Sequence, residues 1–292
     1  MLFLVLNVIF GSAFILILKW VQTHGRDNVM TVGAINYISA WVLATPEMVW
    51  SWPSDIAGES STPEAFQYAW MMGAMLGCCY FTAFFFVIRA IHRVGASRTT
   101  VVGALSILMP IVCGIWLWRE HPNTWQWLGV SLAISALILV GGSRQAGVSW
   151  SWRTALIVLG FFCLAGLARL AQQGFRHNSL PEWRPVFLWM TFACASIPAL
   201  FVLTTRHRPT LHEWSVGLGL GIANILQTHF MLLSLRQFES YIVFPVSSAG
   251  GVVLTAVVAT QILGERINRR SAWGIALATA ALILLNAPLS SD

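Results

Sequence analysis

The chain has 292 residues, of which 57% are hydrophobic and only 10% are charged. A soluble domain carries about 25% charged residues because its surface must face water, so this composition excludes an ordinary soluble protein. The formal net charge of +6 could indicate a nucleic-acid partner. The basic residues, however, stand in small groups at the ends of apolar runs, where a membrane protein meets anionic lipid headgroups. We therefore expect a lipid bilayer, and not nucleic acid, around this chain.

The apolar residues form ten runs of roughly 18 to 25 residues, the length of a bilayer-spanning helix. Continuous apolar runs predict helices, because lipid tolerates only helices or closed barrels. The expected fold class is therefore an all-α integral membrane protein with ten transmembrane helices. The first run lacks the features of a removed signal peptide, so we interpret it as a retained helix. The runs lie at about 1–20, 29–50, 67–90, 98–118, 123–142, 154–175, 184–204, 213–235, 241–263 and 271–288.

Motifs for a metal, a cofactor or enzyme chemistry are missing from the sequence. All five cysteines lie inside apolar runs, where thiols behave as small hydrophobic groups. Their spacing predicts neither a disulfide framework nor a metal site. The chain also lacks a phosphate-binding loop and the signatures of metalloproteases and serine hydrolases. We therefore expect no cofactor and no enzyme activity.

Two stretches of the chain, residues 90–140 and 235–285, repeat each other. Each contains a polar elbow, an apolar run and a glutamate before a polar break, Glu120 in the first and Glu265 in the second. An offset of about 145 residues, half the chain, superimposes them. A membrane protein built from two similar halves is typically a transporter with its site between the halves.

Each predicted half holds five helices, and an odd number makes the second half enter the membrane in the opposite sense. The expected domains are a first five-helix repeat at residues 1–142, a linker at 143–153 and a second, inverted five-helix repeat at 154–292.

The third helix of each half contains a GxxxG pattern, formed by Gly73 and Gly77 in the first half and by Gly217 and Gly221 in the second. Small residues at this spacing let two helix backbones approach closely. The recurrence at nearly the repeat offset predicts that both third helices pack tightly against a neighbour.

The motifs resemble the EamA-like domain of the drug/metabolite transporter superfamily. The first copy reads Ala90, Gly95-Ala96-Ser97, Pro110, Glu120 and Gly129, and the second reads Leu235, Pro245, Gly264-Glu265 and Gly274, with its proline at a different place. The opening Phe10-Gly11-Ser12-Ala13-Phe14 is also similar to that family. The resemblance implies a ten-helix basket around a central cavity lined mainly by helices 1, 3, 4, 6, 8 and 9. It also implies movement of small organic solutes, often export of amino acids, other metabolites or drugs.

The sixth predicted helix carries the strongest candidate site. Arg169, Gln172, Gln173 and Arg176 follow the i, i+3, i+4, i+7 spacing of one helical face. A guanidinium in a cavity pairs bidentately with a carboxylate, such as that of an amino acid. The alternative is that the helix ends early and that both arginines extend toward the headgroups.

The eighth predicted helix carries a second group of polar residues. Asn224, Gln227 and Thr228 share one face, and His229 could titrate near neutral pH and couple transport to protons. The alternative for these residues is hydrogen bonding between helices. Intramembrane polar residues are functional candidates by default, and the remaining candidates for solute binding are Asn7, Tyr80 and Ser106.

The sequence therefore predicts a secondary transporter, with export as the expected direction, of a small organic metabolite such as an amino acid. It would be a multi-pass protein of the plasma (inner) membrane, working by alternating access as a monomer or weak homodimer. The excess of Lys and Arg after odd-numbered helices places both termini outside the cytoplasm, whereas the family resemblance implies the reverse.

Two alternatives remain open, a membrane-embedded lipid-modifying enzyme and a non-transporting membrane scaffold. An enzyme would need an acid/base or metal group at the interface. The candidates for that group are basic-loop residues without evident acidic partners, namely His92, Arg93, Arg206, His207, Arg208 and His212.

Overall fold

The computed structural model describes residues 1–24, 27–50, 63–94, 96–141, 151–179, 181–205 and 208–262, with a few isolated residues between 269 and 284. Helices make up nearly all of these described residues, and no strand occurs among them. The predicted all-α class is therefore confirmed. Five helices of the described part are long and apolar enough to cross a bilayer, which is the pattern of a multi-pass membrane protein.

The first five predicted spans appear at their expected places. They correspond to α1 (Leu2–His24), α2 (Val29–Trp50), α3 (Pro63–Val94), α4 (Ala96–Leu105) with α5 (Leu108–Leu117), and α6 (Thr124–Gly141). The fourth span is divided because Pro110 has no N–H and its ring clashes with the carbonyl of Ser106, four residues earlier. The N–H of Ile107 donates to the carbonyl of Ala104 (3.2 Å), so the carbonyl of Gly103 loses its usual helical donor.

Four further predicted spans lie in the second half. They correspond to α7 (Trp152–Asn178), α8 (Arg184–Thr205), which a short 3₁₀ turn (Pro181–Trp183) precedes, α9 (Leu211–Gln237) and α10 (Ser240–Ile262). Pro245 lies inside α10 without dividing it, so the two halves differ at their prolines. The tenth span at 271–288 falls mostly outside the described residues, and the count of ten helices therefore stays a prediction.

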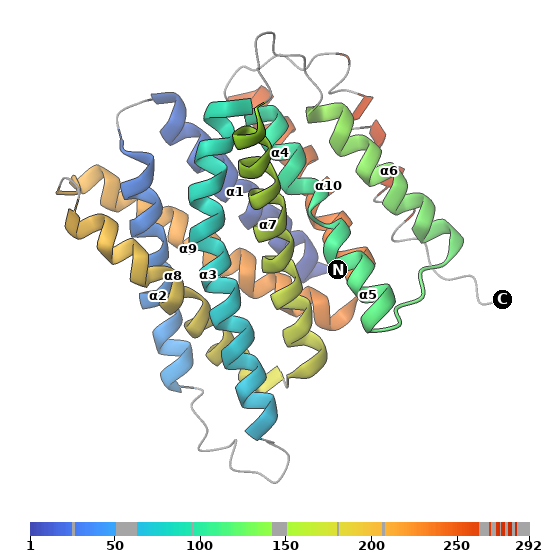
Figure 1. Ribbon diagram of the computed structural model, residues 1–292, viewed down its shortest axis with the longest axis horizontal. Helices are drawn as coiled ribbons and strands as arrows, with labels where there is room; N and C mark the ends of the chain where they lie inside the picture. The colour runs from blue at the N-terminus through green and yellow to red at the C-terminus, as the bar shows by residue number, and fades with distance from the viewer. Residues whose placement is uncertain are drawn as a thin grey trace.

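Helices of one half pack mainly against helices of the other half. α3 lies beside α7 and α8, α2 lies beside α8 and α9, and α1 lies beside α9 and α10 (Figure 1). Exchanging each helix with its counterpart in the other half converts the α3–α7 contact into α9–α1 and the α2–α9 contact into α8–α3. The α2–α8 contact converts into itself.

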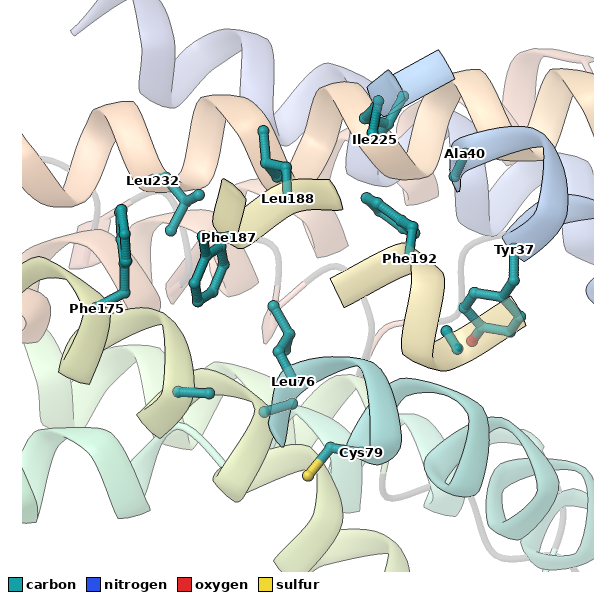
Figure 2. Close-up of a cluster of buried hydrophobic side chains, with 14 of the residues drawn as sticks. Tyr37, Ala40, Leu76, Cys79, Phe175, Phe187, Leu188, Phe192, Ile225 and Leu232 are labelled. Atoms are coloured by element: carbon teal, nitrogen blue, oxygen red, sulfur yellow. The ribbon is translucent and has the colours of Figure 1, made fainter. Parts of the chain in front are cut away.

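The largest hydrophobic core lies where these helices meet. Phe187 and Phe192 of α8 are fully buried against Leu76 of α3, and side chains of α2, α7 and α9 surround them (Figure 2). The core therefore joins the two halves to each other. Aromatic and aliphatic packing of this kind supplies the van der Waals contacts that hold helices together in lipid.

Both GxxxG pairs lie at close helix contacts, as predicted. A Cβ atom on Gly73 would stand 2.7 Å from the carbonyl oxygen of Phe187 in α8. A Cβ atom on Gly221 would stand 2.9 Å from the carbonyl oxygen of Asn36 in α2. Real Cβ atoms do not approach backbone oxygen this closely, so only glycine permits these two contacts.

A capping box formed by Thr210 and Glu213 stabilises the N-terminus of α9. The Thr210 hydroxyl accepts the N–H of Glu213 (3.2 Å), and the Glu213 carboxylate accepts the N–H of Thr210 (2.8 Å). Thr210→Ala should lower the free energy of unfolding by about 1 kcal/mol, measured by thermal unfolding in detergent. Thr204→Ala is the matched control, since that exposed hydroxyl donates to the carbonyl of Phe201 in its own helix. Equal stability of the two variants would contradict the cap.

Candidate functional site

Arg169 of α7 reaches the break between α4 and α5. Its Nη1 donates to the carbonyl of Gly103 (3.0 Å) and to the hydroxyl of Ser106. The Ser106 hydroxyl in turn donates to the same carbonyl (2.6 Å), and Ser106 is fully buried. The carbonyl of Gly103, which loses its helical donor at this break, therefore anchors the guanidinium. The predicted residues Arg169 and Ser106 come together at this point.

A chain of hydrogen bonds connects α7, α3 and α9 near this guanidinium. The Gln172 Nε2 donates to the Tyr80 hydroxyl (3.2 Å), which lies 3.1 Å from the Thr228 hydroxyl. Thr228 donates to the carbonyl of Asn224 (2.9 Å), so its oxygen is free to accept from Tyr80. The direction of the chain therefore runs from Gln172 through Tyr80 to Thr228. Gln172 and Tyr80 are predicted solute-binding residues, and Thr228 belongs to the predicted polar face of the eighth helix.

Asn224 connects α9 to α2 instead of facing the guanidinium. Its Nδ2 donates to the side-chain oxygen of Asn36 (3.2 Å), and both residues are buried. This contact is interhelical hydrogen bonding, the alternative that the sequence left open for Asn224. Gly221, one turn earlier on α9, allows α2 to come this close.

Asn7 and Gln227 also meet, through a backbone atom. The Asn7 Nδ2 donates to the carbonyl of Gln227 (2.9 Å), and the Ser247 hydroxyl donates to the Asn7 Oδ1 (2.7 Å). This group joins α1, α9 and α10. It shares no hydrogen bond with the Arg169 group among the contacts that the structure describes.

Gln173 belongs to a different cluster, one turn further along α7. Its Nε2 donates to the Ser240 hydroxyl (2.7 Å) and to the Glu120 carboxylate (3.3 Å). Arg176 reaches the same carboxylate (3.4 Å) and that of Glu239 (2.8 Å). The polar face of α7 thus faces protein along its length, and Arg176 is held by two glutamates instead of extending toward headgroups.

Glu120 follows the C-terminal end of α5, next to the exposed residue Arg119. The Glu120 side chain is only 3% exposed and pairs with Arg176 of the other half. Glu265, its counterpart in the repeat, lies outside the described residues.

His229 also lies apart from Arg169. Its Nδ1 is 3.8 Å from the Oε2 of Glu47, a residue near the C-terminal end of α2. The other oxygen of Glu47 accepts from Arg184 (3.1 Å). His229 therefore lies beside the ion pair of Glu47 and Arg184, and its role in proton coupling stays a prediction.

One basic-loop residue has an acidic partner that the sequence did not reveal. The Nδ1 of His212 lies 3.0 Å from the Oδ1 of Asp27, across from the start of α2. The side chains of His92, Arg206 and His207 lie outside the described part of the chain. Among the described residues, no three His, Cys, Asp or Glu side chains gather into a group that could hold a metal ion.

A hollow of about 430 Å³ lies between α1, α9 and α10. Its lining is mostly apolar and consists of Leu16, Ile17, Trp20, Ser215, Val216, Gly219 and Val258. None of the predicted site residues lines it. The central cavity that the family resemblance implies stays a prediction.

The fold and the site together define a class, a multi-pass helical membrane protein with polar residues buried between its helices. The model of the EamA-like transporter family matches residues 1–142, which is the whole first predicted repeat. The resemblance is thereby confirmed over that half, in agreement with the drug/metabolite transporter superfamily. The family that this model describes is a family of transporters.

Comparison with solved structures supports the same fold over both halves. Twenty-nine chains of known structure match. One crystal structure of a protein with 15% sequence identity superposes with a TM-score of 0.74, covering 98% of this chain and 95% of that chain. At this identity the likeness shows the fold alone. No curated protein matches the chain.

Proposed function

We propose that the protein is a secondary transporter that exports a small organic solute bearing a carboxylate, such as an amino acid. The observation that carries this proposal is that Arg169 has no acidic partner among the described residues. Its guanidinium lies inside the helix bundle, yet no carboxylate of the described residues lies within ion-pair distance of it. A cation inside a membrane protein is costly without a counter-charge. The carboxylate of the solute would supply that charge.

The neighbouring groups support a polar head of the solute at this point. Gln172, Tyr80 and Thr228 form an uncharged chain of donors and acceptors. Such a chain can exchange its internal hydrogen bonds for bonds to a ligand at little cost. The residues come from α3, α7 and α9, and the guanidinium is anchored at the α4–α5 break, so both halves contribute to the site.

We infer that transport proceeds by alternating access between two inverted halves in the plasma membrane, with the protein acting as a monomer or weak homodimer. The support is the symmetry of the helix contacts described above. Under a twofold axis, a contact between two helices either has an equivalent contact between their counterparts or is its own equivalent on the axis. The divided α4–α5 segment adds a place where a helix can bend without breaking further hydrogen bonds.

A ligand screen on the purified protein tests the proposed solute class. Ligands that bind only the folded state raise the unfolding temperature by mass action. We expect a set of amino acids to raise it, and the corresponding decarboxylated amines to leave it unchanged. Equal shifts with an amino acid and its amine would contradict recognition of the carboxylate by Arg169.

A further inference from the structure

Glu120 is held in a buried pocket that three separate segments build. The Ser240 hydroxyl at the start of α10 donates to its Oε2 (2.6 Å), and the Gln173 amide of α7 donates to its Oε1 (3.3 Å). A Cβ atom on Gly114 would stand 2.7 Å from the same Oε2. The pocket therefore fits a carboxyl group closely, and the glycine leaves space for it.

The turn after α5 directs this side chain inward. Arg119 adopts a φ of 53°, in the left-handed region, and the N–H of Glu120 donates to the carbonyl of Gly114 (3.1 Å). A non-glycine residue in this region costs free energy and persists where the surrounding structure requires it. The chain thus accepts local strain to place Glu120 between the two halves.

The pocket can satisfy both the charged and the neutral form of Glu120. The charged form accepts the hydrogen bonds of Ser240 and Gln173. The Oε1 of Gln173 is buried and has no donor among the described residues. Half a turn of that amide would bring this oxygen to the place of Nε2, where it can accept the O–H of a protonated Glu120. By flipping, the Gln173 amide can donate a hydrogen bond to the charged carboxylate of Glu120 or accept one from its protonated form.

The charged and titratable groups around Glu120 come from every segment packed against it. α7 contributes Arg176 (3.4 Å) and His177 (Nε2 at 3.5 Å), and Trp118 stacks on the histidine ring with centroids 4.8 Å apart. The turn before α10 contributes Glu239. Tyr241 of α10 and the exposed residues Arg119 and His121 complete the set.

Glu239 keeps Arg176 neutralised when Glu120 is protonated. The hydrogen bond from Arg176 lowers the pKa of the Glu239 carboxyl, although its partial burial acts in the opposite direction. Glu239 is 43% exposed and lies 2.8 Å from Arg176. Arg176 can therefore remain paired with Glu239 alone. Its ion pair with Glu120 can then break without leaving the guanidinium unpaired.

We propose that Glu120 is a proton-binding site that couples solute movement to protons, and that its charged form holds the two halves together at this face. This inference rests on the proposed transport function. A proton from water at this face would reach Glu120 through the partly exposed His177, and binding would release the bonds from Arg176 and His177. Only neutral hydrogen bonds to Gln173 and Ser240 would then hold Glu120, so the ends of α5 and α7 would separate more easily, as opening of this face requires.

Infrared difference spectroscopy of the purified protein tests the proton site without any solute. Lowering the pH from about 8 to about 4 covers the titration of ordinary carboxyl groups. We expect wild type to gain a carbonyl band at the frequency of a buried, protonated carboxyl, and Glu120→Gln to lack it. Glu182→Gln, which removes an exposed carboxylate near the same end of α7, should keep the band. A band that persists in Glu120→Gln, or none in wild type, would overturn the proposal.

A second measurement tests the coupling in proteoliposomes supplied with a pool of radiolabelled amino acids. Wild-type transport should respond to a pH gradient, while Glu120→Gln should exchange solute across the membrane without that response. An equal response in both proteins would refute the coupling role of Glu120. Absence of transport in wild type would instead refute the proposed solute class, and the infrared result would still decide the proton site.

Discussion

Arg169→Ala should lower the transport efficiency, kcat/KM, for an amino acid by at least about 30-fold. Removing one partner of a desolvated charge pair costs about 2–5 kcal/mol, and each 1.4 kcal/mol is about a factor of ten. The variant loses the guanidinium that donates to the carbonyl of Gly103 and that we propose to bind the solute carboxylate. Initial rates of uptake into proteoliposomes give the value directly.

Two matched variants make this result specific. Arg169→Lys keeps the charge but loses the planar fork of the guanidinium, so it should retain an intermediate efficiency. Arg153→Ala removes an exposed arginine from the first turn of the same helix, where the guanidinium lies over Trp152 (5.7 Å to the ring centroid), and it should transport normally. An Arg169→Ala protein as active as the Arg153→Ala protein would exclude Arg169 from the solute site.

Gly77→Ala should be the most destabilising single-methyl change in the helix interfaces described above. The added Cβ would overlap the carbonyl oxygen of Thr191 and stand 2.8 Å from the Cβ of Cys194. A backbone oxygen in α8 cannot turn aside as a side chain can, so α3 and α8 must separate. Overpacking costs about 1–3 kcal/mol and sometimes more, and we expect a loss at or above the upper end, measured by thermal unfolding in detergent.

Gly219→Ala is the matched control for this substitution. It adds the same methyl group to α9, but among the described residues no atom beyond its chain neighbours and the adjacent backbone of α9 lies within 4 Å of the new position. Alanine is favoured over glycine in a helix by about 1 kcal/mol, so this variant should be as stable as wild type or slightly more stable. Similar losses in the two variants would mean that α3 and α8 do not approach each other as described.

The sequence predicted the elements of the fold well because hydrophobic length sets a membrane helix almost by itself. Nine of the ten predicted spans coincide with described helices, and the GxxxG glycines lie at close contacts. The division of the fourth span at Ser106 also follows from a local cause, the ring of Pro110. Features that depend on a few neighbouring residues were therefore accessible from the sequence.

The partners of the site residues were less accessible. The spacing along α7 predicted one polar face, and that face does point into the protein. The spacing did not reveal that Arg169 and Gln173 bind different segments, the α4–α5 break and the pocket of Glu120. Those pairings depend on which helices lie opposite, and long-range packing decides that.

The acidic partners illustrate the same limit. Glu47 and Glu120 stand at helix ends, where a carboxylate is ordinarily solvated, so composition gave no reason to pair them with His229 and Arg176. The recurrence of a glutamate at Glu120 and Glu265 was the one signal in the sequence that could have singled out Glu120. Ser240, which donates to Glu120, carried no such signal.

Counterflow of a radiolabelled amino acid in proteoliposomes is the most direct test that the two halves enclose a pathway for a carboxylate-bearing solute. Vesicles loaded with unlabelled amino acid should accumulate the label faster than protein-free vesicles, and loading with the decarboxylated amine should give no acceleration. Accumulation no faster than in protein-free vesicles for every amino acid tested, or equal acceleration by the amine, would contradict the account.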